Sequence, residues 1–169
     1  MPEPQHVDPV AQFARQLNHL VAALDPHEGW YAVLLRSEGE AITACLNGTA
    51  VPPWDVVSSL LDDLHRKRGI TDSARDRAQE QHRAAVRAHD RRAGRQALRE
   101  LLKQAFMERD TADAGIRGLY QPTSQDGAQQ QAVDLFKMRD RHERAVARCT
   151  ELQARLSTLG ADRDADALP

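Results

Sequence analysis

A row of basic residues is the largest set of side chains in this 169-residue chain that could bind a ligand by charge. Because an α-helix completes a turn in about 3.6 residues, a cation at every fourth position predicts one continuous ridge along a helix. Such a ridge fits the phosphates of a nucleic acid or an acidic protein surface, including the protein's own first domain. A solvated helix face, partly offset by nearby acids, is the alternative. The row comprises Arg83, Arg87, Arg91, Arg95, Arg99 and Lys103.

Histidine and cysteine are too sparse to indicate a metal centre. His82 and His89 share one helix face, but two histidines without a third ligand make a poor metal site. His142 falls in a heptad core and is interpreted as a polar core residue. Cys45 and Cys149 occupy apolar helical positions without a CxxC pattern, which predicts buried, reduced thiols. Since the chain also lacks a glycine-rich phosphate loop, a nucleophile motif and a placed carboxylate pair, we expect no enzyme activity, metal or cofactor.

Charge and composition separate an acidic beginning from a basic remainder. Residues 1–69 carry 5 basic and 9 acidic side chains, a charge of −4, whereas residues 70–169 carry 18 and 16, a charge of +2. Aromatic residues are only 4% of the chain, which limits the size of its core. No signal peptide and no apolar run near the roughly 18 residues of a membrane span are present, so we expect a cytoplasmic, soluble protein without membrane contact.

Apolar residues at helical spacing predict an all-α first domain over residues 8–69. Its helices are expected over 9–24, 30–35, 40–47 and 53–65, and no neighbouring segment could pair with 30–35 as a strand. Trp54 opens the last helix and is expected to fill the core. The start and stop signals are Asp8-Pro9, Asn47-Gly48 and Gly69.

Two long helices are expected in the region 70–159, followed by a disordered tail over 160–169. The first, about 71–114, buries little in its first half, and a loop over 115–127 leads to the second, 128–159, which Gly160 ends. The heptad seam of the second helix predicts that the two helices pair as a hairpin or across a homodimer built mostly by 128–159. The expected dimerisation residues are Leu135, Met138, Cys149, Leu152, Leu156 and Leu159.

Residues 9–66 resemble the Xre or lambda-repressor-like helix-turn-helix domain of bacterial regulators. The most specific match is the helix that opens Pro52-Pro53-Trp54-Asp55-Val56-Val57. Ala32, Ile42, Thr43 and Asn47-Gly48 also match the family pattern, whereas Arg36, Glu38, Ala41 and Ala44 depart from it. The resemblance implies a small five-helix domain with a recognition helix that faces duplex DNA. Its contact residues would be Glu38, Glu40, Ala41, Thr43 and Ala44.

Two functions follow from this resemblance. The first is a DNA-binding transcriptional regulator that dimerises through its C-terminal helices, with a second copy and double-stranded DNA as partners. The second is an interaction protein whose helix-turn-helix domain grips an acidic or helical protein instead. The second function is kept because Glu38 and Glu40 place carboxylates where DNA phosphates would lie.

Overall fold

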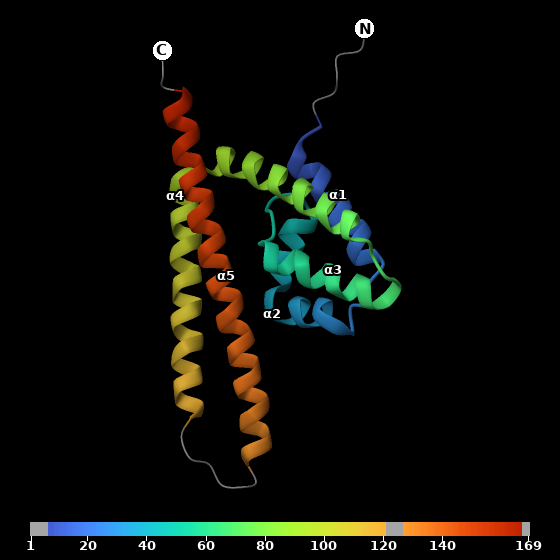
Figure 1. Cartoon of the computed structure of the whole chain (residues 1–169), viewed down its shortest axis with the longest axis vertical. Coiled ribbons are helices and arrows are strands. Elements are labelled where there is room, and N and C mark those ends of the chain that lie inside the picture. Colours follow the sequence, from blue (N-terminus) through green and yellow to red (C-terminus); the bar gives the residue numbers. More distant parts are fainter. Residues whose placement is uncertain (1–6, 121–126, 167–169) are drawn as a thin grey trace. The chain divides into compact units, whose positions relative to one another are not determined.

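The computed structural model describes residues 7–120 and 127–166, which form five helices and no strand. The all-α class predicted from the sequence is confirmed. The chain divides into two compact units, residues 1–93 (unit 1) and 94–169 (unit 2). Figure 1 labels the helices, which are α1 (Pro9–Ala22), α2 (Gly29–Leu46), α3 (Trp54–Arg68), α4 (Asp72–Leu119) and α5 (Ala128–Asp166).

Gly94 divides α4 between the two units. Its backbone angles, φ 79° and ψ 172°, belong to a region that only glycine adopts readily, so the α-helical path is broken there. The helix expected over about 71–114 is therefore interrupted at Gly94, and the two units meet there, whereas the sequence placed the end of the first domain at residue 69. The physical reason lies in residues 72–93, which complete the core of unit 1 through the fully buried Ala85.

The helix boundaries in unit 1 follow their local signals. Asp8 caps α1 by accepting a hydrogen bond from the Val10 amide at 3.2 Å. Gly48 and Gly69, with φ of 74° and 71°, follow the ends of α2 and α3. Residues 30–35 are helical, as predicted, and form part of the first segment of α2. These boundaries are confirmed because each depends on a few neighbouring residues.

A kink at Glu38 separates α2 into segments 29–37 and 39–46. Glu38 has non-helical angles of φ −136° and ψ 28°. The Ser37 hydroxyl donates to the Val33 carbonyl at 3.0 Å, a bond that satisfies a carbonyl at the end of the first segment. Figure 1 shows α2 changing direction between its two segments. The turn expected around Arg36–Gly39 is thus a kink within one helix.

The first turn of α2 is capped by a side chain from α3. Glu28 at the N-cap makes no side-chain capping bond, but the buried Asp63 carboxylate accepts from the Tyr31 amide at 2.8 Å. Gly29 has φ +67°, and a Cβ there would lie 2.7 Å from both Asp63 carboxylate oxygens. Arg66 forms an ion pair with the same carboxylate. Asp63 therefore joins α2 to α3 at a buried position.

The core of unit 1 consists of two packed clusters. Leu60 is fully buried at the centre of the first, with Leu17, Leu34 and Ile42 around it. The second cluster joins α1, α3 and the first part of α4, whose green ribbon crosses α1 in Figure 1. Trp54 packs at its edge and is only half-buried, so it fills less of the core than the sequence predicted. The second cluster contains Val10, Phe13, Val57, Leu61 and Ala85.

Unit 2 is a hairpin of the second part of α4 and α5. Leu98 and Ala105 pack against Cys149 and Leu152 in one buried cluster. The final helix continues through Gly160 to Asp166, so the expected helix end at Gly160 and disordered tail from 160 are wrong for residues 160–166. Residues 167–169 lie outside the described ranges. α4 likewise extends to Leu119, and positions 121–126 of the expected loop lie outside them too.

Candidate functional site

The outward face of residues 39–46 occupies the place of the expected recognition helix. Ile42 and Cys45 anchor this segment in the core, which leaves Glu40, Ala41 and Thr43 exposed. Glu38 and Ala44 are half-buried. The segment is thus held by its inner residues and presents a short face of small and acidic side chains.

α1 fixes the far end of this segment. The Asn18 side-chain amide donates to the Ala14 carbonyl at 2.8 Å within α1 and to the Leu46 carbonyl of α2 at 2.9 Å. A single amide group therefore satisfies a carbonyl at the C-terminus of α2, where helical carbonyls lack intrahelical partners. The position of residues 39–46 depends on this bond as well as on apolar packing.

The chemistry of this face is that of hydrogen-bond acceptors. Residues 38–46 include two carboxylates, Glu38 and Glu40, and no basic residue. The Thr43 hydroxyl donates to the Gly39 carbonyl at 2.9 Å, so its oxygen remains available to accept. Burial raises the pKa of the Cys45 thiol to about 12, and the Glu38 carboxylate adds to the shift. Cys45 is therefore a protonated core residue and no nucleophile.

The cationic ridge expected from the sequence is split at Gly94. Arg83, Arg87 and Arg91 belong to unit 1, and their side chains are exposed. The other three cations, Arg95, Arg99 and Lys103, belong to unit 2. Because the helical path ends at Gly94, a single continuous ridge of six cations does not form.

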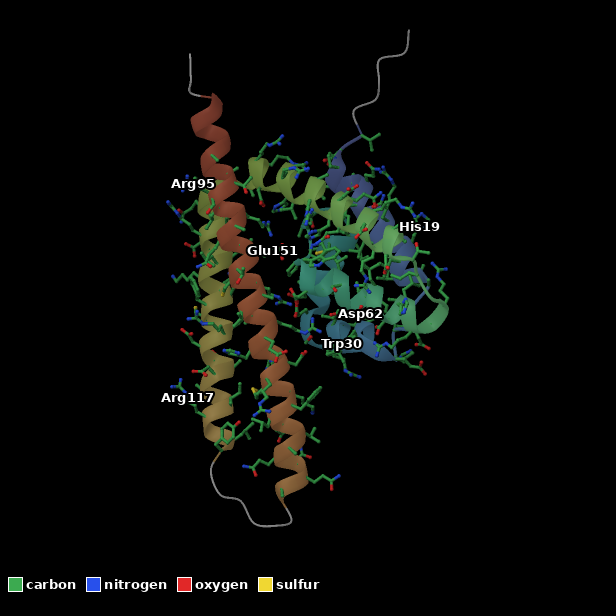
Figure 2. The ribbon with its side chains drawn as sticks, in the orientation of Figure 1. His19, Trp30, Asp62, Arg95, Arg117 and Glu151 are labelled. Carbon is green, nitrogen blue, oxygen red and sulfur yellow. The ribbon has the colours of Figure 1, made fainter. Side chains whose placement is uncertain are left out.

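Polar contacts, together with the packing of Ala85, hold residues 72–93 to the rest of unit 1. Arg75 donates to Asp62 on α3 at 2.6 Å, and Figure 2 labels Asp62. Arg92 pairs with Asp8 at 3.0 Å at the start of α1. Between them, His82 Nε2 lies 2.7 Å from the Pro52 carbonyl oxygen. This segment is therefore fastened near both ends and in its middle, although the sequence suggested that it buries little.

His82 is a structural residue of unit 1. Its side chain is only 4% exposed, and its ring lies 5.5 Å from the Phe13 ring and 5.3 Å from the Trp54 ring. His89 contacts the neighbouring Asp90 at 3.4 Å. Among the side chains that the structure describes, no group of three or more His, Cys, Asp or Glu residues could hold a metal ion.

The charge of the first domain changes once residues 70–93 are included. Unit 1 has 11 basic and 13 acidic residues, a charge of −2, compared with −4 for residues 1–69 alone. The acids Glu38 and Glu40 lie on α2, whereas Arg83, Arg87 and Arg91 lie on the first part of α4. Unit 1 therefore carries an acidic and a basic region on different helices.

The predicted dimerisation seam packs within the chain. Cys149 and Leu152 are buried against the second part of α4, and Leu156 and Leu159 pack on the same cluster. Leu135 and Met138 are half-buried, and a Cβ on Gly115 would lie 3.0 Å from the Met138 sulfur. In the structure these seam residues pack against the second part of α4 of the same chain. A homodimer stays a prediction, and it would need surfaces other than this seam.

Sequence reasoning missed the polar residues that join the helices of unit 1. Asp63 and His82 are polar residues on buried helix faces, and Asn18 bridges two helices. The sequence did contain a sign of the role of Asp63, because this acid lies within the apolar stripe of α3 that includes Leu60 and Leu64. Such a position usually requires a buried hydrogen-bond partner.

Comparison with known proteins found no matching family model, no matching curated protein and no matching solved structure. In the described part of the chain, every helix is too short or too polar to cross a bilayer.

Proposed function

We propose that unit 1 is a helix-turn-helix domain of the Xre or lambda-repressor-like type and that the protein is a DNA-binding transcriptional regulator. The observation that carries the proposal is the outward face of residues 39–46, which follows the kink at Glu38 and exposes Glu40, Ala41 and Thr43. A short helix with an exposed face of this kind can enter a DNA major groove. Five helical segments in unit 1, two of them from α2 and one from α4, support the same proposal.

Selection from a random duplex library by the full-length protein tests this function. We expect an enriched sequence, lost in Ala41→Asp because a further carboxylate enters the contact face. Ala132→Asp is the matched control, since Ala132 is exposed on α5 in unit 2. Failure to enrich any sequence at about 50 mM salt, where phosphate contacts are strong, would contradict the proposal.

The second candidate function is a protein interaction made by the same face. It is favoured by the pair Glu38 and Glu40, because carboxylates at this position repel phosphates and attract basic groups. A photo-crosslinking residue at position 41 of the full-length protein separates the candidates in cells. Crosslinks to DNA support the regulator, and crosslinks to one protein support the interaction function.

The proposal includes a homodimer formed by unit 2. Several large apolar side chains lie outside the hairpin seam, among them Phe136 at 69% and Met107 at 62% exposed. A two-helix hairpin buries apolar side chains along one seam only, so these residues gain contacts when a second hairpin associates. Association of two copies would give the regulator two DNA-binding units.

A further inference from the structure

We infer that Arg83, Arg87 and Arg91 form a second contact surface, which binds the phosphate backbone of double-stranded DNA. This inference rests on the proposed function and deepens it. Residues 39–46 would contact base edges, and the outward face of residues 72–93 would supply the sequence-independent charge contacts. Because base contacts and phosphate contacts would come from different helices, a domain with acidic side chains at residues 38–40 could still bind DNA.

Helix geometry places the arginines on the outer side of their segment. Ala85 is fully buried against α1 and α3. Arg83 and Arg87 are each two residues from Ala85, so they lie about 200° around the helix from it. Arg91 follows one turn later, and successive members of the row are about 6 Å apart along the axis. All three are exposed, as this geometry requires.

The segment that carries the row is fixed before any ligand binds. Arg75 and Arg92 pair with Asp62 and Asp8 on either side of the row, and His82 contacts the Pro52 carbonyl beside it. Binding would therefore order only the three arginine side chains and not the helix beneath them. Such preorganisation lowers the entropic cost of association.

The electrostatic environment leaves these three cations available. Across the described residues, Arg83, Arg87 and Arg91 make no ion pair, whereas Arg75 and Arg92 are both paired within unit 1. Between residues 81 and 93 the only acid is Asp90, whose side chain is buried. Glu80 is exposed just before the row and limits the basic surface on that side. Positive charge is thus concentrated over residues 83–91.

Salt-dependent binding of the full-length protein to a random duplex tests the inference. Three phosphate contacts contribute about −2.7 to the slope of log K against log salt, which corresponds to a roughly 40-fold loss between 50 and 200 mM salt. The variant R83A/R87A/R91A should lose this contribution. The variant R95A/R99A/K103A removes the same charge from unit 2 and should keep it. R83K/R87K/R91K retains three cations and should restore most of the slope.

The two triple-alanine variants together decide the matter. Equal slopes in both would show that binding follows net charge and would overturn the inference. An unchanged slope in R83A/R87A/R91A would also overturn the inference. If the protein still enriches a sequence in the library selection, the regulator function would remain supported in that case. If the unmodified protein does not bind DNA at all, both the regulator function and the arginine contact surface are contradicted. Circular dichroism melts of each variant establish that the helices remain folded.

Discussion

Removal of the Asp63 carboxylate should destabilise unit 1 more than removal of its neighbour. Asp63 is 8% exposed and accepts from the Tyr31 amide at 2.8 Å, at a helix start where Glu28 supplies no side-chain cap. The substitution Asp63→Ala leaves that buried amide without its acceptor and Arg66 without its ion-pair partner. The damage falls on the start of α2 and on its attachment to α3.

The magnitude follows from the two interactions that are lost. A helix cap contributes about 1 kcal/mol, and an unsatisfied buried amide costs about 1–3 kcal/mol. Because these terms describe partly the same bond, we expect Asp63→Ala to lower the free energy of unfolding by about 2–3 kcal/mol. At roughly 4–8 °C for each kcal/mol in a unit of this size, the melting temperature should fall by about 10–20 °C. Asp63→Asn keeps an acceptor oxygen and should cost about 1 kcal/mol.

Tryptophan fluorescence measures this effect in the full-length protein, because both tryptophans, Trp30 and Trp54, lie in unit 1. Asp62→Ala is the matched control: Asp62 is the adjacent acid, it is exposed, and its pair with Arg75 should contribute less than about 1 kcal/mol. Equal melting temperatures for Asp63→Ala and Asp62→Ala would contradict this prediction, because the buried cap would then contribute nothing beyond a surface pair.

Three further predictions concern packing, protonation and assembly. Trp54→Ala should cost about 2–3 kcal/mol by chemical denaturation, less than the roughly 3–5 kcal/mol of a fully buried tryptophan, because Trp54 is half-buried; a loss above 4 kcal/mol would contradict its edge position. Burial raises the pKa of Asp8, but the Val10 amide and Arg92 outweigh it and hold the pKa below its usual value. The stabilisation by the Asp8 carboxylate should be complete above its usual pKa and should disappear as the pH falls through its lowered pKa. Arg92→Ala should raise the titration midpoint of the Asp8 carboxyl measured by NMR, and an unchanged midpoint would exclude the Asp8–Arg92 pair. Phe136→Glu should halve the mass that light scattering gives for the full-length protein, whereas Val33→Glu on unit 1 should not, and an unchanged mass in Phe136→Glu would exclude this dimer surface.

The sequence predicted those parts of the fold that local chemistry controls. Asp8-Pro9, Asn47-Gly48 and Gly69 set helix boundaries through bonds between near neighbours, and all were found where expected. Two other glycines were misread in opposite directions. The helix expected over about 71–114 ran through Gly94, which is a break, whereas Gly160 was expected to end a helix and remains helical. Glycine allows either conformation, and the surrounding packing selects one.

The missing part of unit 1 could not be read from hydrophobic periodicity. Ala85 gives a weak apolar signal, yet it is fully buried because α1 and α3 lie against it. His82 reads as polar, although its ring packs with Phe13 and Trp54. The basic surface was predicted only in part. The four-residue spacing correctly grouped Arg83, Arg87 and Arg91, but the separation of these three from the later cations became visible only in the backbone angles at Gly94.

The break at Gly94 also determines where the chain can change length. An extra residue within an α-helix rotates everything beyond it by about 100°. Inserted near Lys103, it would turn the buried Ala105 away from Cys149 and Leu152 and disrupt the hairpin seam. Inserted next to Gly94, it would fall where the helical path is already interrupted, and the faces of 72–93 and of 95–119 would each keep their own register. Insertions and deletions should therefore accumulate at this joint among related proteins, while the helices on both sides keep a constant length.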